Sequence, residues 1–250
     1  MSSERQLLKE QSPWWAEHIH RYTEVLKIIK STDTILDIAC GTGFGSNILA
    51  NKAAQVIGGD IDKTTITENN TIYHKDNLTF EVLDGTKLPF DDNTFDVLVS
   101  FETIEHTIHY NEMIKEFKRV LKPTGKLFIS TPNFYLNSPS GIVTNPFHTQ
   151  EFTPNEFNEL ISTYFQKFEI FGQEYIRYKN KKSINYIIAH KIEQFHYLRG
   201  IRKLPLRLQN IAINLLINKP QYPTLEDYSL TKDSSIIAKK CITQLAICEK

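Results

Sequence analysis

Hydrophobic residues between positions 34 and 131 occur in short runs that alternate with stretches of helical periodicity. The runs predict strands over 34–39, 54–60, 78–84, 95–101 and 126–131. Helical patterns occupy the intervening segments 44–52, 62–73 and 110–121. The sequence KPTG at 122–125 then breaks the helical pattern. Regular alternation of strands and helices is typical of a parallel sheet with helices on both faces.

The segments on either side of this core have patterns of their own. An apolar stripe of helical period, starting beside Ser12 and Pro13, predicts a helix over 13–30. TPNE at 153–156 has the form of a capping box, which predicts a helix from there to Tyr164. Two further strands are expected at 167–172 and 242–250, and the pattern between these strands is helical.

Composition excludes several classes of protein. The 250 residues are 40% apolar and 23% charged, which is enough for a packed core in one large domain with an appendage. Three cysteines cannot form a disulfide framework, and no Cys/His spacing resembles a zinc site, so we expect no metal. The polar N-terminus lacks a signal-peptide core, and the apolar run 211–217 is too short to span a bilayer. These observations predict a soluble protein of a reducing compartment, the cytoplasm.

The net charge of zero conceals an uneven distribution. Lys plus Arg (29) balances Asp plus Glu (29), which excludes a uniformly basic nucleic-acid coat. Residues 173–220, however, contain ten lysines and arginines against two glutamates. We therefore treat 173–240 as a basic helical insertion or cap.

Glycine is concentrated where the first strand ends. Six of the ten glycines lie between 41 and 85, and three of them belong to ILDIACGTGFG at 35–45. Their spacing is G-x-G-x-G, whereas dinucleotide-binding turns have G-x-G-x-x-G. Asp37 stands four residues before Gly41, and a carboxylate there repels pyrophosphate but attracts a cation such as the ammonium of an amino acid.

Two more acids occupy the ends of the next two predicted strands. Asp60 is positioned to accept hydrogen bonds from ribose hydroxyls, and Asp84, followed by Gly85 and Thr86, to accept one from an exocyclic amine. The carboxyl ends of parallel strands form the edge at which open α/β sheets bind ligands. The alternative is that such acids only cap the following helix or turn, as we expect of Asp62.

Together these stretches resemble the class I S-adenosylmethionine (SAM)-dependent methyltransferases. The resemblance covers about 13–172 and the final strand, through LDIACGTGFGS, VIGGDID, LDGTKLPF, FDVLVSFETIEH, EFKRVLKPTGKLFISTPN and NPFHTQEFTPNEF. It is strongest to the branch holding ubiquinone-type methyltransferases and small methyltransferases of bacterial polysaccharide gene clusters. It implies a doubly wound, Rossmann-like, mostly parallel seven-stranded sheet. The expected domains are an N-terminal helical lid (1–32), a SAM-binding domain (33–172 and 241–250) and the insertion (173–240).

The resemblance also implies which residues bind SAM. Asp37 and the loop Ala39, Cys40, Gly41, Thr42 and Gly43 would hold the methionine part. The ribose side would involve Asp60 and Ile61, and the adenine side Asp84, Gly85 and Thr86, with Ser100 and Phe101 closing the pocket. Arg21 could reach the carboxylate of SAM, with Trp14 and Tyr22 as a lid; the alternative is an amphipathic helix packed on the sheet. Ala39 departs from the family, which often has glycine there.

Methyl transfer from a sulfonium is an in-line displacement, so alignment of the reactants supplies much of the catalysis. A hydroxyl acceptor would also need a base. The leading candidate is His106, which follows the fourth strand, and the second is His148, with Glu105 and Glu151 as possible partners. The alternative roles are structural: His106 would cap the following helix and His148 would fix a loop.

The expected acceptor is an oxygen on a sugar or a polysaccharide or glycolipid precursor. An alternative is an enzyme that methylates a quinone-like or other small molecule. A second alternative is a protein that binds SAM without catalysing methyl transfer. The basic segment 177–217 has three interpretations. It could be a solvated cap over the acceptor pocket, a peripheral contact with the inner face of the membrane, or a surface that binds RNA phosphates. No recognised RNA module accompanies it, so we do not expect a nucleic-acid partner. The sequence does not indicate an oligomeric state.

Overall fold

The computed structural model describes residues 14–199, 206–220 and 222–250. The predicted helix start at Ser12 and Pro13 lies outside these residues, as do Arg202 and Lys203 of the basic segment. The strands are β1 (Thr34–Ile38), β2 (Gln55–Asp60), β3 (Leu78–Val82), β4 (Phe95–Phe101), β5 (Leu121–Pro132), β6 (Lys167–Tyr175), β7 (Tyr228–Thr231) and β8 (Cys241–Glu249). The α-helices are α1 (Trp15–Ile28), α2 (Phe44–Leu49), α3 (Lys63–Ile72), α4 (Tyr110–Val120), α5 (Phe134–Asn137), α6 (Pro154–Tyr164), α7 (Ile184–Arg199), α8 (Leu206–Ile217) and α9 (Ser234–Lys240). Two 3₁₀ turns, η1 (Ile104–His106) and η3 (Leu225–Asp227), complete the described elements.

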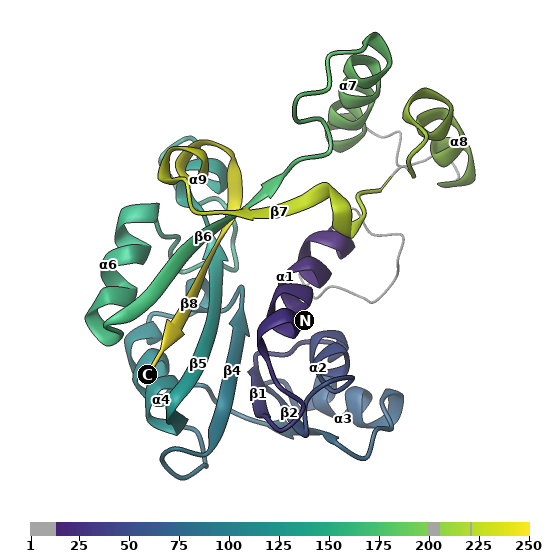
Figure 1. Cartoon of the computed structure of the whole chain (residues 1–250). Helices are drawn as coiled ribbons and strands as arrows, with labels where there is room; N and C mark the ends of the chain where they lie inside the picture. The colour runs from purple at the N-terminus through teal and green to yellow at the C-terminus, as the bar shows by residue number, and fades with distance from the viewer. Residues whose placement is uncertain (1–13, 200–205, 221) are drawn as a thin grey trace. The chain divides into compact units, whose positions relative to one another are not determined.

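The strands form one mostly parallel sheet in the order β3-β2-β1-β4-β5-β8-β6-β7 (Figure 1). Strands β3, β2, β1, β4 and β5 are parallel to their neighbours, and β8 is antiparallel to both β5 and β6. Chain progression reverses at β1, because β2 lies on one side of it and β4 on the other. Open α/β sheets bind ligands at such a switch point, beyond the carboxyl ends of the strands. This predicts a site after Ile38.

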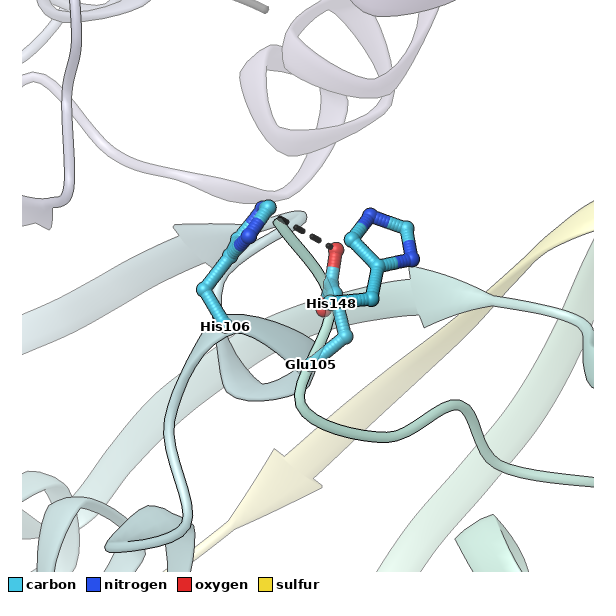
Figure 2. A group of neighbouring side chains, drawn as sticks. All are labelled: Glu105, His106 and His148. Carbon is cyan, nitrogen blue, oxygen red and sulfur yellow. Dashed lines mark ion pairs between the residues drawn. The ribbon is translucent and has the colours of Figure 1, made fainter. Parts of the chain in front are cut away.

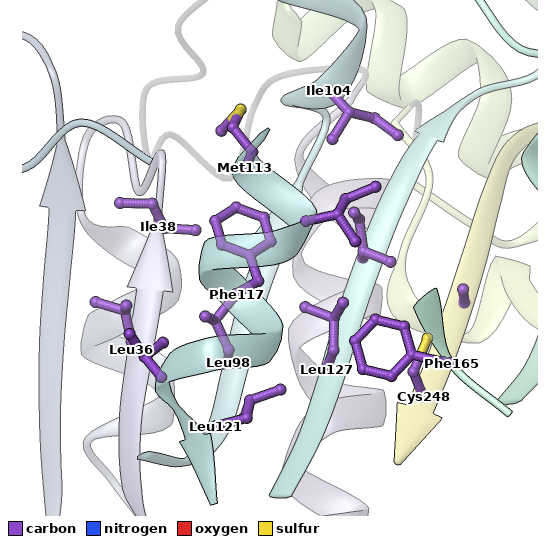
Figure 3. Packing of buried hydrophobic residues seen from close by; sticks show 14 of the residues in the cluster. Leu36, Ile38, Leu98, Ile104, Met113, Phe117, Leu121, Leu127, Phe165 and Cys248 are labelled. Atoms are coloured by element: carbon purple, nitrogen blue, oxygen red, sulfur yellow. The ribbon is translucent and has the colours of Figure 1, made fainter. Parts of the chain in front are cut away.

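Alternate residues of the central strands pack on opposite faces of the sheet. On one face, Leu36, Leu98 and Leu127 belong to the core that α4 and α6 cover (Figure 3). On the other, Ile35 and Val97 belong to a second core, together with α2, α3 and the part of α1 from Tyr22 onward. Because side chains alternate along a strand, a strand covered on both sides has to be continuously apolar. This explains the mostly apolar sequence FDVLVSF of β4.

The structure confirms most of the predicted elements, and the differences have local causes. Thr153 and Glu156 form the predicted capping box of α6, with Pro154 in its first turn. Strand β5 starts at Leu121, earlier than expected, because Leu121 pairs with Phe95 and pairing resumes at Lys126 with Val97. Residues 122–125 are an irregularity between these pairs, as expected for a segment with proline, which has no N–H for the ladder.

The eighth strand, β7, is a correction, since the sequence predicted seven strands and a helical segment throughout 173–240. β7 has only four residues, too few for a period-2 pattern to be recognised. The helix α9 follows it.

The described chain divides into two compact units. The first, residues 21–174 and 230–250, contains most of the sheet and all the predicted SAM-binding and catalytic residues. The second, residues 14–20 and 175–229 without 200–205 and 221, contains α7 and α8, which pack through Ala189, Ile213 and Ile217. No helix within the described residues combines the length and apolar character needed to cross a bilayer.

Candidate active site

Asp37, in β1, carries a carboxylate that is enclosed by protein. Its side chain is only 1% exposed. One oxygen, Oδ2, accepts a 2.6 Å hydrogen bond from Ser46 Oγ, and the Tyr22 hydroxyl lies 3.2 and 3.4 Å from the two oxygens. Burial raises the pKa of Asp37 to about 7, although the hydrogen bonds from Ser46 and Tyr22 act in the opposite direction. A cation brought to this carboxylate would lower its pKa and be held strongly.

The loop after β1 has a left-handed backbone at three positions. Ala39, Gly41 and Gly43 have φ values of 60°, 52° and 74°, in the left-handed region. Asp60 accepts a 3.0 Å hydrogen bond from the Gly41 N–H, and Asn69 Nδ2 donates to the Gly41 carbonyl at 2.8 Å. A Cβ added at Gly41 would meet no atom within 4 Å, so a ligand can approach the backbone closely there.

Ala39 is the residue in this loop that the left-handed conformation disfavours. A Cβ in this region costs about 1–2 kcal/mol, and the greater freedom of glycine in the unfolded chain offsets part of that. We therefore expect Ala39→Gly to raise the free energy of unfolding by up to about 1 kcal/mol, measured by urea denaturation. Ala50→Gly is a suitable control because Ala50 has a right-handed φ of −63°; it should destabilise. Equal effects of the two substitutions would contradict the assignment of strain to Ala39.

The acids after β2 and β3 differ in their surroundings. Asp60 is buried, and its oxygens accept hydrogen bonds from the N–H groups of Gly41 (3.0 Å) and Asp62 (2.9 Å). Asp84 is exposed and accepts hydrogen bonds from the backbone and hydroxyl of Thr86. It lies two residues beyond the end of β3, so the predicted strand 78–84 was too long. The hydrogen bonds with Thr86 are local contacts of the turn-capping type.

Other predicted residues lie around these acids as follows. Ile61 is 71% exposed, Thr42 and Thr86 are half-buried, and Gly85 is buried. Cys40 is buried too, and burial, with Asp37 and Asp60 nearby, raises the pKa of its thiol. The thiol thus stays protonated, as expected if Cys40 fills space in the loop and does not act as a nucleophile. Asp62 caps α3 through Thr64 and Thr65, as predicted.

The residues at the end of β4 adjoin α1. The Phe101 ring makes an edge contact with Tyr22, with centroids 5.0 Å apart. The guanidinium of Arg21 lies 5.8 Å from the centroid of the same ring and donates a 2.8 Å hydrogen bond to Gln173. Both Tyr22 and Arg21 are buried, so this part of α1 follows the packed-helix alternative. The Ser100 hydroxyl is also buried, and no group in the described chain hydrogen-bonds to it.

A second group of side chains, Glu105, His106 and His148, lies beyond β4 (Figure 2). The rings of His106 and His148 have centroids 4.9 Å apart at 77°. His106 Nε2 is 3.9 Å from Glu105 Oε1. Glu105 is fully buried, and burial, with the charge of Glu102 in addition, raises its pKa well above the ordinary value. The fold thus brings together all three predicted catalytic residues.

The hydrogen-bond partners of each histidine select one tautomer of its neutral ring. His106 Nδ1 lies 2.9 Å from the Phe147 carbonyl, which can only accept, so Nδ1 carries the hydrogen and Nε2 the lone pair. His148 Nδ1 is 2.8 Å from Glu151 Oε1, and its Nε2 is 3.0 Å from the amide nitrogen of Asn145. His148 thus contacts two residues of its own loop. His106 does not cap α4, whose N-cap is His109.

Several residues of the site were not recognised from the sequence. Ser46 and Asn69 contact Asp37 and the Gly41 carbonyl from α2 and α3, and nothing in their local sequence marks them. Glu102 has a left-handed φ of 51°, and its side chain accepts a 2.8 Å hydrogen bond from Ser130. Non-glycine residues in this conformation concentrate at functional sites, but the sequence does not reveal the conformation.

Comparison with known proteins gives consistent matches. A family model described as a methyltransferase domain matches residues 36–129. A probable S-adenosylmethionine-dependent methyltransferase of Mycolicibacterium smegmatis is 34% identical over 157 residues, which are 62% of this chain and 60% of that protein. A ubiquinone biosynthesis O-methyltransferase of Coxiella burnetii is 35% identical over 101 residues, 40% of this chain and 43% of that protein. A SAM-dependent methyltransferase from Archaeoglobus fulgidus has a similar fold, with a TM-score of 0.60 at 17% identity, covering 94% of each chain.

The matches in sequence cover only part of this chain and part of each relative. The chain spans 60% of the length of the M. smegmatis relative and 53% of two Mycobacterium tuberculosis relatives. The matched family model lies within the first structural unit and extends from β1 into β5.

Proposed function

Residues 36–129 match a methyltransferase-domain model, and the chain resembles SAM-dependent methyltransferases in sequence. From this premise we propose that the chain is a class I SAM-dependent methyltransferase that transfers a methyl group from SAM to an oxygen of a sugar, polysaccharide or glycolipid precursor. The observation that carries the proposal is the buried carboxylate of Asp37 beside a left-handed loop at the switch point of the sheet. The carboxylate favours a cationic ligand, and the loop allows that ligand to lie close to its backbone.

The residues present fit SAM. When bound, SAM supplies a methyl group that its sulfonium has already activated. Asp37 would pair with the ammonium of SAM, since burial strengthens such a pair. Asp60, a carboxylate at the end of β2 whose oxygens accept hydrogen bonds from the backbone of Gly41 and Asp62, would accept hydrogen bonds from the ribose hydroxyls. Ile61, exposed next to it, offers an apolar surface for a base, and the open side of Gly41 leaves room for the methionine chain.

His106 is the group we assign to the acceptor. With its hydrogen on Nδ1, the lone pair on Nε2 can take a proton from a hydroxyl. A positioned base contributes about 10²–10⁴-fold to such a rate. Glu105 supports this role because its carboxylate lies on the Nε2 side of the ring.

The test is incubation of the pure protein with methyl-labelled SAM and a cell extract, followed by mass spectrometry of metabolites and glycans. We expect S-adenosylhomocysteine and a labelled glycan or glycolipid. His106→Ala should keep its SAM affinity and lose about 100-fold or more in turnover. His109→Ala is the matched control, because His109 is exposed and its side chain caps nothing. Unchanged turnover of the His106 variant would remove it from the mechanism.

Two alternatives have distinct outcomes in the same experiment. Label in a quinone-like compound would support the second acceptor class, which the match to the C. burnetii O-methyltransferase favours. SAM binding without any S-adenosylhomocysteine in any extract would indicate a binding module.

We also infer that α7 and α8 contact an anionic membrane. Their outward side chains include Ile184, Ile187 and Leu215, which are 66%, 44% and 81% exposed. Exposed Lys181, Lys182 and Lys191 lie in the same segment. Apolar side chains together with cations are the signature of surfaces that bind anionic lipid. Arg177 does not contribute, because it is buried and paired with Asp227.

Sedimentation with vesicles containing anionic lipid tests this inference. The protein should sediment at low salt, and Ile184→Glu with Leu215→Glu should weaken binding about tenfold or more. Each substitution removes an apolar contact with the lipid and adds a negative charge, and one charge near an anionic surface changes the binding free energy by about 1 kcal/mol. Ile72→Glu in α3, 62% exposed, is the control and should bind normally. Binding to tRNA but not to vesicles would contradict the inference.

A further inference from the structure

We propose that Glu105, His106 and His148 bind a divalent transition-metal ion, contrary to the expectation from the sequence that no metal is present. One donor atom from each side chain lies within 4.8 Å of the other two, and Figure 2 shows the three side chains clustered together. The argument that an ion binds here uses only the structure and does not depend on the proposed function. Its role, to hold an acceptor oxygen beside the methyl donor, rests on the proposed function.

The first argument is the unsatisfied oxygen of Glu105. The residue is fully buried. Its Oε2 accepts a 3.0 Å hydrogen bond from Thr131, but no group in the described part of the chain hydrogen-bonds to Oε1. A buried polar atom without a partner costs about 1–3 kcal/mol, and more when it is charged. Oε1 faces His106, so a cation between the two would satisfy it.

The second argument is the tautomer of His106. Because Nδ1 donates to the Phe147 carbonyl, the neutral ring has its lone pair on Nε2. Two acceptors then face each other across 3.9 Å, a distance too long for a hydrogen bond. Ligands about 2.1 Å from one ion lie about 3 to 4.2 Å apart. The spacing therefore suits two ligands of the same ion.

The third argument is the environment of His148. A metal-binding histidine almost always donates its other N–H to a carboxylate or carbonyl, which fixes the ring. His148 has this arrangement with Glu151, and Ser138 donates a 2.9 Å hydrogen bond to the second oxygen of Glu151. His106 has it with the Phe147 carbonyl. An ion would take the place of the Asn145 amide at His148 Nε2.

The donor set indicates the kind of ion. Two imidazoles and one carboxylate suit zinc, manganese, iron or cobalt, whereas magnesium and calcium prefer oxygen ligands throughout. Three protein ligands leave coordination positions open, as in catalytic metal sites. A bound hydroxyl would become more acidic on such an ion.

The experiment is a titration of the full chain with Mn²⁺, followed by electron paramagnetic resonance of the free ion. We expect one ion bound per chain, displaced by Zn²⁺. His106→Ala, which changes a partly exposed side chain, should weaken binding at least tenfold. Glu105→Gln should act in the same direction, with circular dichroism to confirm its fold. His109→Ala is the control, because His109 is an exposed histidine outside the cluster, and this variant should bind Mn²⁺ as the parent does.

The outcomes separate this proposal from the proposed function. Failure of both Mn²⁺ and Zn²⁺ to bind the parent would overturn the metal site, and so would equal binding by the parent and the His106 variant. Calorimetry with SAM on the same samples tests the methyltransferase assignment independently. Bound Mn²⁺ without SAM binding would therefore refute only the proposed function.

Discussion

Replacing Asp37 by asparagine is expected to weaken the binding of SAM about 30-fold or more. The carboxylate is buried and held by Ser46 and Tyr22, so its pairing with the SAM ammonium would be shielded from water. Removing one partner of a buried charge pair costs about 2–5 kcal/mol, and 1.4 kcal/mol is a factor of ten in affinity. Isothermal titration calorimetry at pH 7.5 measures the change.

Asp76→Asn is the matched control, because Asp76 is exposed and lies in the turn before β3. It should bind SAM with the affinity of the parent. Parent-like affinity in the Asp37 variant would refute the assignment of the ammonium site, and with it the main support for the proposed function.

The same residue makes SAM binding depend on pH in a defined direction. In the ligand-free protein burial raises the pKa of Asp37 to about 7, and the ammonium of SAM stabilises the charged form. Binding below pH 7 must therefore release a proton, and the affinity should fall about tenfold per unit as the pH decreases from 7 towards 5.5. Calorimetry in two buffers of different ionisation enthalpy counts the proton. Asp37→Asn should remove both effects; their persistence would assign them to another group.

The second large effect is expected from Gly45→Ala. A Cβ at Gly45 would lie 1.9 Å from Tyr22 Cζ and 2.3 Å from its hydroxyl oxygen. The tyrosine ring cannot move away easily, because it packs edge-on against Phe44 and Phe101. Overpacking of this kind costs about 1–3 kcal/mol or more, whereas alanine in a helix gains only about 1 kcal/mol over glycine. The steric cost should therefore exceed the gain in helix propensity.

We expect the free energy of unfolding to fall by about 2 kcal/mol and SAM affinity to fall as well, because a displaced Tyr22 no longer donates to Asp37. Urea denaturation measures the first effect and calorimetry the second. A double-mutant cycle provides the control, since in a Tyr22→Ala background the clash is absent and Gly45→Ala should be neutral or stabilising. The same loss in both backgrounds would show that Tyr22 is not the cause.

The metal proposal changes how His106 is to be understood. The geometry that makes Nε2 a base also makes it a metal ligand, because both roles need the lone pair that the Phe147 carbonyl fixes there. Activity of the His106 variant cannot separate the two roles, whereas Mn²⁺ binding can.

The sequence by itself determined the features that depend on neighbouring residues. Apolar runs and helical periods predicted the core strands and helices, and β7 was missed because four residues carry no period. TPNE predicted its capping box because both partners belong to one turn. The concentration of glycines indicated where the loop after β1 lies, whereas the left-handed φ values of this loop are a finding of the structure.

Only the tertiary structure decided how each acid behaves and which distant side chains meet. Asp37 and Asp84 were predicted in equivalent positions, yet β1 lies inside the sheet with a strand on each side, while β3 is at its edge. Asp37 is therefore buried and its pKa is raised, whereas Asp84 is exposed. His106 and His148 meet although 41 residues separate them. Desolvation and contact depend on what the folded chain brings together, and no local pattern contains that information.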